Sequence, residues 1–316
     1  MKDTGTQFIE EWHADIEISE DFVKKLLQEQ FAELNPITSI QYLGEGWDNK
    51  VFLANKKTVF RFPRRKLSVE LQKQENIILK NLPDFSSVRI PRLQFIGQAT
   101  ALYPYPFQGY EVIPGVPAYQ ANLSMEERSA NITALALFLK QLHAINSTQA
   151  QAIGVVPQST DNLSNVEQVI SRLERCIAKI STRGLCHINY DCLKQEIAVA
   201  KRLVLSGEPC LVHGDLDGRQ LIFNDKKLIG IIDWGDVDIS TRVLDLEVVW
   251  SFYPSSCHAK FFEIYGEVEH GMWSYARFLA LYTSFSLLLY GADIQDAKLV
   301  TEATHSIIRI NANLLM

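Results

Sequence analysis

The chain of 316 residues lacks paired cysteines, a long apolar run and an excess of basic charge. Its five cysteines include no C-x-x-C pair, which favours free thiols in the cytoplasm over a disulfide framework or a zinc site. No apolar segment typical of a signal peptide is visible at the N-terminus. The longest apolar stretch, residues 278–290, is too short to span a bilayer and predicts a core helix. A net charge of −6 argues against a nucleic-acid partner, so we expect neither nucleic acid nor membrane as a partner.

Residues 211–238 contain two apolar runs, each followed by a carboxylate and a turn. The first run leads into H-G-D, which ends at Asp215, and the second leads into D-W-G, which begins at Asp233. Segments 221–223 and 228–232 are expected to form a β-hairpin, which would place these two carboxylates side by side. Two carboxylates at such a short distance repel each other unless a metal ion or a shared proton lies between them. Because carboxylates bind through oxygen, the metal that suits them is Mg²⁺.

These turns resemble the catalytic signatures of the kinase fold, H-R-D-L-x-x-x-N and D-F-G. The H-G-D-L run keeps His, Asp and Leu, whereas Gly214 replaces Arg and Gln220 stands where Asn is usual. In this form the pair of turns resembles the aminoglycoside and macrolide phosphotransferases, which are antibiotic kinases of the protein-kinase-like fold. The resemblance implies that Asp215 is the catalytic carboxylate and that Asp233 and Gln220 hold Mg²⁺.

A glycine-containing turn is expected upstream, between the first two of three predicted strands. Residues 44–51 read G-E-G-W-D-N-K-V, and the kinase pattern G-x-G-x-x-G-x-V is met at Gly44, Gly46 and Val51. Asn49 takes the place of the third glycine, since Asn tolerates the left-handed backbone. Backbone N–H groups of such a turn approach phosphate closely. The alternative is an ordinary hairpin that happens to contain two glycines.

Arg61 lies in the third predicted strand, at the place of the lysine in the kinase V-A-I-K motif. A guanidinium can clamp the α- and β-phosphates, and arginine here is similar to what macrolide kinases carry. Residues 67–82 predict a helix whose apolar stripe includes Glu75. A carboxylate on an apolar face needs a partner, and we expect Arg61 to be that partner. The alternative is a surface arginine on an edge strand.

The fold class that the resemblance implies is α+β, a protein-kinase-like fold of two lobes. Residues 1–110 would form an N-lobe with an antiparallel sheet and one main helix. Residues 111–116 would be the hinge, and residues 117–316 a mostly helical C-lobe. Backbone groups near the hinge would bind the purine of the nucleotide, and three residues are expected to supply them: Glu111, Val112 and Ile113.

The acidic residues after the second turn suggest a site for a cation. Between residues 211 and 270 there are eleven Asp or Glu and five Lys or Arg. Asp236 and Asp238 follow the metal turn directly, so we expect them to face the substrate, and Glu247 is among the acids that would extend the patch. A solvated acidic surface is the alternative. Asp245 matches an aspartate of the family and is expected to hold the catalytic loop by hydrogen bonds.

The sequence thus predicts a Mg²⁺-dependent transferase that moves the γ-phosphate of ATP or GTP to a hydroxyl of an aminoglycoside-type antibiotic. A macrolide or another small hydroxylated metabolite is the alternative acceptor. A second alternative is a non-catalytic nucleotide-binding protein. It is suggested by departures from the family pattern, namely Asn49, Arg61, Gln220 and Thr241-Arg242, whereas the retained Asp215 and Asp233 argue against it. The expected partners are the small-molecule acceptor and the nucleotide, and the expected state is a monomer or weak dimer.

Overall fold

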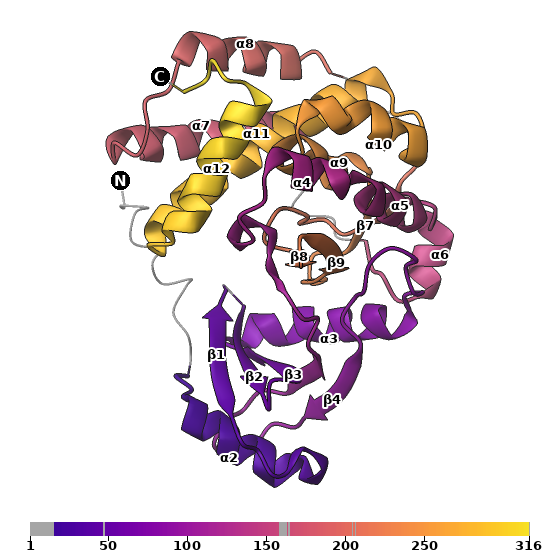
Figure 1. Ribbon diagram of the computed structural model, residues 1–316, viewed down its shortest axis with the longest axis vertical. Coiled ribbons are helices and arrows are strands. Elements are labelled where there is room, and N and C mark those ends of the chain that lie inside the picture. The colour runs from indigo at the N-terminus through magenta and orange to yellow at the C-terminus, as the bar shows by residue number, and fades with distance from the viewer. Residues whose placement is uncertain are drawn as a thin grey trace. The chain divides into compact units, whose positions relative to one another are not determined.

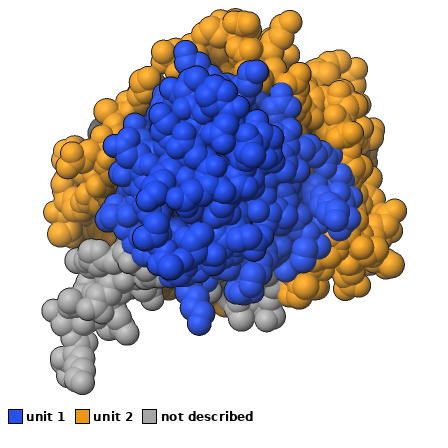
Figure 2. All heavy atoms as spheres, turned by 90° about the horizontal axis from the view of Figure 1, so that it is seen from below, with its two compact units in different colours: residues 1–82, 91–113 blue, residues 83–90, 114–316 orange. Residues whose placement is uncertain are grey.

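The chain forms two compact units in this computed structural model. Figure 2 colours unit 1, residues 1–82 and 91–113, and unit 2, residues 83–90 and 114–316. The residues that the structure describes are 16–46, 48–157, 163, 165–203, 205 and 207–315. None of the helices among them is long and apolar enough to cross a membrane.

Unit 1 is built on a five-stranded antiparallel sheet in the order β1-β2-β3-β5-β4 (Figure 1). Its strands are β1 Ile40–Glu45, β2 Asn49–Ala54, β3 Thr58–Pro63, β4 Leu93–Gly97 and β5 Phe107–Glu111. Successive side chains of a strand point to opposite faces, so Phe60 and Phe62 of β3 share one face and Arg61 points to the other. The position of Arg61 in β3 therefore decides which face of the sheet carries its charge.

Two helices cover the two faces of this sheet (Figure 1). Helix α2, Glu20–Gln30, begins where the Ser19 hydroxyl accepts the Phe22 N–H at 3.2 Å, and its Leu26 and Leu27 pack into the aromatic core with Phe60 and Phe62. Helix α3, Lys66–Asn81, lies on the Arg61 side, where it contributes Glu75. The face of the sheet that carries Phe60 and Phe62 thus forms the hydrophobic core of unit 1. The opposite face carries the Arg61–Glu75 ion pair.

Unit 2 is mostly helical. The helices are α4 Met125–Ala130, α5 Ile132–His143, α6 Ser147–Ala152, α7 Val166–Thr182, α8 Tyr190–Ala200, α9 Val243–Phe252, α10 His258–Tyr265, α11 His270–Asp293 and α12 Ala297–Ile310. The predicted core helix at 278–290 is confirmed as part of α11, which packs against α7, α9 and α12. Short 3-10 helices span Ala32–Leu34 in unit 1 and Ala118–Gln120 and Ser255–Cys257 in unit 2.

Short strands in unit 2 position the motif residues. A three-stranded sheet has the order β6-β8-β9, and β7 pairs with β10. Their bounds are β6 Val116–Pro117, β7 Cys210–Val212, β8 Leu221–Asn224, β9 Lys227–Ile231 and β10 Asp238–Ser240. Asp225 and Lys226 join β8 to β9 with positive φ angles of 46° and 64°, the geometry of a tight hairpin turn. The predicted hairpin and the α+β fold class are both confirmed.

Candidate active site

The H-G-D loop follows β7 and lies against the turn that contains Asp236. Gly214 has a φ of +89°, and a Cβ there would stand 2.2 Å from the Asp236 carbonyl oxygen. Only glycine combines that backbone conformation with that close contact. The glycine before Asp215 therefore allows two turns that are far apart in the sequence to pack backbone to backbone.

Asp245 of α9 holds this loop from inside the core. Its fully buried carboxylate accepts the backbone N–H groups of His213 at 2.8 Å and Gly214 at 2.9 Å. His143 Nε2 lies 3.0 Å from the same carboxylate, and His143 Nδ1 lies 2.7 Å from the Tyr265 hydroxyl. Desolvation alone would raise the pKa of Asp245, but the hydrogen bond and charge of His143 hold that pKa below its usual value. The predicted role of Asp245 is confirmed.

Asp215 lies in the open part of the loop, with 40% of its side chain exposed. Gln220 Nε2 donates to its carboxylate at 3.2 Å, and Arg219 Nη2 donates to it at 3.3 Å. Desolvation raises the pKa of Asp215 to about 6, and Arg219 opposes the rise. The negative charges of the neighbouring Asp217 and Asp233 raise the pKa of Asp215 further. An accessible carboxylate with this pKa is suited to take a proton from a hydroxyl near neutral pH.

Asp233 begins the second turn with a φ of +67°, which is rare outside glycine and marks a residue held by its surroundings. The next residue, Trp234, is fully buried, and its Nε1–H donates to the Ile231 carbonyl at 3.1 Å. The turn is tied to the catalytic loop, because the Ile232 N–H donates to the Gln220 carbonyl at 3.1 Å. The hairpin thus brings the carboxylates of the two turns close enough for one charge to shift the pKa of the other.

Asp233 and Gln220 offer oxygen donors, which suit a hard divalent cation better than a transition metal. No cluster of three or more His, Cys, Asp or Glu side chains in the described part of the chain could hold a metal ion. Gln220 is 3% exposed, and its Oε1 accepts the Asp217 N–H at 3.2 Å. An amide oxygen has a second lone pair, so this hydrogen bond leaves it able to bind a metal. Two protein oxygens completed by water and nucleotide phosphates are the donor set that Mg²⁺ accepts.

The predicted partnership of Arg61 and Glu75 is confirmed in unit 1. Arg61 Nη1 donates to Glu75 Oε1, and Gln108 Nε2 donates to Glu75 Oε2 at 3.1 Å. Arg61 is 9% exposed and Glu75 is 2% exposed. The alternative of a surface arginine on an edge strand is therefore wrong, since β3 lies between β2 and β5.

The glycine turn forms the connection between β1 and β2, as predicted, but Asn49 does not act as a left-handed residue. Asn49 begins β2, where it pairs with Pro63, and its φ is not positive. It is 8% exposed, and its Oδ1 has no hydrogen-bond partner among the described residues. Gly44 carries a positive φ, of 151°, and the Gly46 N–H donates to the Asn49 carbonyl at 2.9 Å. Val51 pairs with Arg61 across the strands.

The three residues expected at the purine lie at the end of β5. The Val112 N–H donates to the Lys57 carbonyl at 2.7 Å, so this donor is already engaged. Glu111 is the last residue of β5 and pairs with Thr58. The Ile113 N–H has no hydrogen-bond partner among the described residues.

The acidic residues after Asp233 do not form one surface. Asp236 is exposed, whereas Asp238 is half-buried in β10 and accepts the Ile239 N–H at 2.7 Å. Glu247 was expected to extend the patch, but it is 5% exposed, because α9 is buried on nearly all of its sides. Desolvation, followed by the charge of Asp217, raises its pKa well above the ordinary value.

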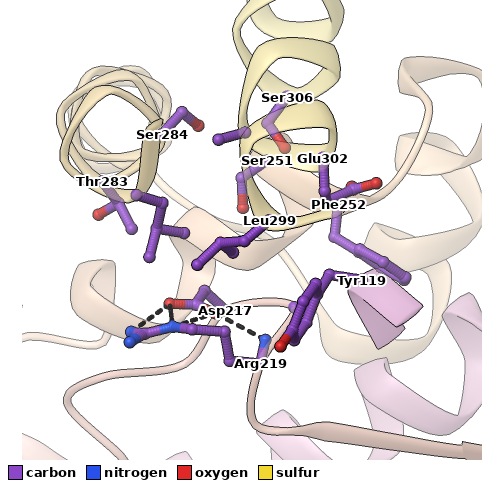
Figure 3. A pocket seen from close by; sticks show the side chains of 13 residues that line it. Tyr119, Asp217, Arg219, Ser251, Phe252, Thr283, Ser284, Leu299, Glu302 and Ser306 are labelled. Atoms are coloured by element: carbon purple, nitrogen blue, oxygen red, sulfur yellow. Dashed lines mark hydrogen bonds and ion pairs between the residues drawn. The ribbon is translucent and has the colours of Figure 1, made fainter. Parts of the chain in front are cut away.

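A pocket beside the catalytic loop contains residues that the sequence reading missed (Figure 3). Asp217 and Arg219 reach it from the loop, and Ser251 of α9 has a buried hydroxyl without a hydrogen-bond partner among the described residues. Its two acids are paired, Asp217 with Arg219 and Glu302 with Arg128 at 2.7 Å each. Further hydroxyl groups line it from Tyr119, Thr283, Ser284 and Ser306. In the sequence, the contact between Asp217 and Arg219 is indicated only by their spacing of two residues.

Comparisons with known proteins agree with this geometry. A model of the phosphotransferase enzyme family matches residues 39–280. Over 158 residues the chain is 30% identical to aminoglycoside 3′-phosphotransferases of Escherichia coli and Salmonella typhimurium, in matches that cover 49% of this chain and 56% of each relative. The matched part thus spans about half the length of these curated relatives.

Solved structures share the fold over nearly the whole chain. The GDP complex of aminoglycoside 2′-phosphotransferase-IIIa has 24% sequence identity and a TM-score of 0.68, covering 94% of this chain and 99% of that one. A macrolide 2′-phosphotransferase of Brachybacterium faecium has 19% identity and a TM-score of 0.60, covering 91% and 98%. At these identities the likeness establishes the fold, and the acceptor has to be argued from the site.

Proposed function

The chain belongs to the phosphotransferase enzyme family, and from this we propose that it transfers the γ-phosphoryl group of ATP or GTP to a hydroxyl of a small molecule. The observation that carries the proposal is Asp215, a half-buried carboxylate held by two donors on a loop that the buried Asp245 fixes. Asp215 takes the proton of the acceptor hydroxyl while that oxygen forms a bond to the γ-phosphorus. The bond from the γ-phosphorus to the bridging oxygen breaks, the nucleoside diphosphate leaves, and the proton passes from Asp215 to water.

Several groups of residues are proposed to bind the nucleotide. Asp233 and Gln220 would hold Mg²⁺, which would supply positive charge to the phosphate oxygens. Arg61 contacts the α- and β-phosphates, and Glu75 orients its guanidinium. Catalysis of this kind consists of positioning and charge neutralisation, so each of these residues acts by fixing a phosphate oxygen. The remaining nucleotide contacts come from residues of the glycine turn and of the end of β5: Gly44, Gly46, Asn49, Val51, Glu111, Val112 and Ile113.

The proposed acceptor is an aminoglycoside-type antibiotic. The exposed Asp236 and the half-buried Asp238 lie just after the metal turn and can attract a polycation. The relatives that match at 30% identity are aminoglycoside phosphotransferases, which supports the same class. A macrolide is the second candidate, because Arg61 stands where the kinase motif has lysine, which is similar to what macrolide kinases carry.

The cell compartment and assembly state form part of the same proposal. The five cysteines are all free thiols, and burial raises the pKa of Cys176 to about 11 and of Cys210 to about 12. Protonated, buried thiols need no oxidising compartment, which supports a cytoplasmic protein. We propose that it acts as a monomer or weak dimer whose lobes are residues 1–110 and 117–316, joined by a hinge at 111–116.

An acceptor panel tests this function. The purified chain is incubated with Mg²⁺, ATP or GTP and one acceptor at a time, kanamycin or a macrolide, and the product mass and nucleoside diphosphate release are measured. Acceptor-dependent diphosphate release with one added phosphoryl group on kanamycin is the expected result. Its KM should rise with salt and with Asp236→Asn, because screening weakens attraction between exposed charges. Nucleotide binding without any phosphorylated acceptor would identify a non-catalytic nucleotide-binding protein instead.

A further inference from the structure

Arg219 places a fixed positive charge at the catalytic loop. Its Nε donates to both carboxylate oxygens of Asp217, at 3.1 and 3.0 Å, and its Nη2 donates to Asp217 Oδ2 at 2.7 Å. The Arg219 backbone N–H donates to Asp217 Oδ1 at 2.7 Å as well. Asp217 is 2% exposed, so this acceptor is itself held by the protein. A guanidinium bound by two parallel hydrogen bonds to a buried carboxylate has a defined orientation.

The same guanidinium reaches the proposed catalytic carboxylate. Arg219 Nη2 lies 3.4 Å from Asp215 Oδ1 and 3.3 Å from Asp215 Oδ2, both longer than its contact with Asp217. Gln220 completes the arrangement, because its Nε2 donates to Asp215 Oδ2 and its Oε1 accepts the Asp217 N–H, each at 3.2 Å. Arg219 and Gln220 therefore both connect the buried Asp217 to the half-buried Asp215.

The guanidinium of Arg219 is also partly open to its surroundings. Arg219 lines the pocket beside the loop and keeps 30% of its side chain exposed (Figure 3). Its Nη1 has no hydrogen-bond partner among the described residues. The guanidinium is thus anchored on Asp217, and it makes its longer contacts with Asp215.

We propose that Arg219 is a positioning residue for phosphoryl transfer, which acts by fixing the Asp215 carboxylate relative to the acceptor hydroxyl. This role rests on the proposed function. Asp217 anchors the guanidinium, and the guanidinium holds the two oxygens of Asp215 so that one lone pair stays directed at the acceptor. Positioning of this kind affects the rate of the chemical step, because a misplacement of about 1 Å costs roughly 100-fold in rate.

Two substitutions of Arg219 and one matched control test this role. Arg219→Gln removes the guanidinium, and Arg219→Lys keeps the charge but loses the fork that spans two carboxylates. Arg277→Gln is the control, because Arg277 also makes a two-pronged pair, with Glu196, and is 27% exposed in unit 2. The measurements are kcat and acceptor KM, the affinity for a non-hydrolysable nucleotide analogue, and the Tm.

Arg219→Gln should lower kcat by roughly 100-fold, with acceptor KM and nucleotide-analogue affinity nearly unchanged. Arg219→Lys should recover only part of this loss, and Arg277→Gln should keep the kcat of the unmodified chain. A loss of Tm in Arg219→Gln without a change in kcat would show that the bridge is merely structural and would overturn the proposal.

A double-substitution cycle shows whether Arg219 works through Asp215. Residues that act as one unit are non-additive, so Arg219→Gln should change kcat little further in an Asp215→Asn background. A full additional loss in that background would overturn the proposed route. Absence of transfer by the unmodified chain would overturn the proposed function and this role together. Transfer by the unmodified chain with undiminished transfer by Arg219→Gln would overturn the role of Arg219 alone.

Discussion

Single residues in the two motif turns decide whether the turns can bind a metal ion and phosphate. Among these residues, Gln220 is the clearest departure from the kinase pattern. Its amide is buried, and its oxygen already accepts one hydrogen bond from the Asp217 N–H. The extra methylene relative to Asn does not remove an oxygen from the site. In the proposed site, it would change only the position from which that oxygen approaches Mg²⁺.

Gln220→Ala should raise the Mg²⁺ concentration needed for tight nucleotide binding, because it removes one of two protein oxygens that Mg²⁺ would use. Gln220→Asn should keep the requirement low, since it restores an amide oxygen. The measurement is nucleotide affinity as a function of Mg²⁺ concentration. An unchanged Mg²⁺ dependence in Gln220→Ala would remove this residue from the metal site.

Arg61 and Glu75 form a buried ion pair, so a cycle of single and double substitutions should show strong coupling. Each single change, Arg61→Gln or Glu75→Gln, leaves the other partner buried without its ion pair, and we expect a marked loss of nucleotide affinity. The double variant should cost much less than the sum of the two. Strictly additive losses in nucleotide binding would show that the two residues do not act as a pair.

Glu247 makes stability depend on pH. Its pKa is raised in the folded protein, so folding favours the protonated form, and the stabilisation present below its ordinary value of 4.5 is lost as pH rises through the raised value. Glutamine at position 247 does not titrate, so Glu247→Gln does not lose stability in this way. Its Tm should therefore rise relative to that of the unmodified chain as pH increases over that window. Glu263→Gln is the control, because Glu263 is exposed and paired with Lys260. Equal pH profiles for Glu247→Gln and the unmodified chain would contradict this account.

At the scale of elements, the catalytic loop and the metal turn are held together by backbone contacts. Gly214 is the point of closest approach, with a positive φ and no room for a Cβ next to the Asp236 carbonyl. The hairpin β8–β9 and the Asp245 hydrogen bonds then fix the loop on either side. The geometry of the H-G-D loop therefore depends on the turn that contains Asp236, on the hairpin β8–β9 and on helix α9.

Gly214→Ala should destabilise the protein by at least about 2 kcal/mol, because it combines an unfavourable backbone conformation with an overlap against a carbonyl. Gly235→Ala is the matched control in the neighbouring turn, since a Cβ there meets nothing within 4 Å and its φ is not positive. Chemical denaturation of both variants measures the difference. Equal free energies of unfolding for the two variants would mean that the turns do not pack as described.

Elements were predicted well where local patterns determine them. The hairpin follows from alternating residues around Asp225 and Lys226, and the Arg61–Glu75 pair follows from strand and helix periodicity. The conformation of Asn49 was predicted wrongly because strand pairing with β3 overrode its tolerance for the left-handed backbone. The burial of Glu247 was missed because α9 is apolar on all sides, so its sequence does not reveal which face is covered.

At the scale of the whole molecule, the candidate residues divide between the two units. Unit 1 contains the phosphate-binding candidates of the glycine turn and the Arg61–Glu75 pair. Unit 2 contains the catalytic loop and the metal turn, with the pocket beside them. The pairing of Asp217 with Arg219 could not be predicted from sequence, because a two-residue spacing fixes no geometry until the loop is packed.

The central claim is that Asp215 accepts the proton of the acceptor hydroxyl, and the most direct test is the kcat of Asp215→Asn. Asparagine keeps the shape but cannot take the proton, and removal of general-base work costs roughly 10²–10⁴ in rate. The measurement is acceptor-dependent release of nucleoside diphosphate, with nucleotide affinity and Tm as controls for folding. We predict a loss of at least about 100-fold in kcat with nucleotide affinity nearly unchanged. Near-normal turnover by a folded Asp215→Asn protein would contradict the account.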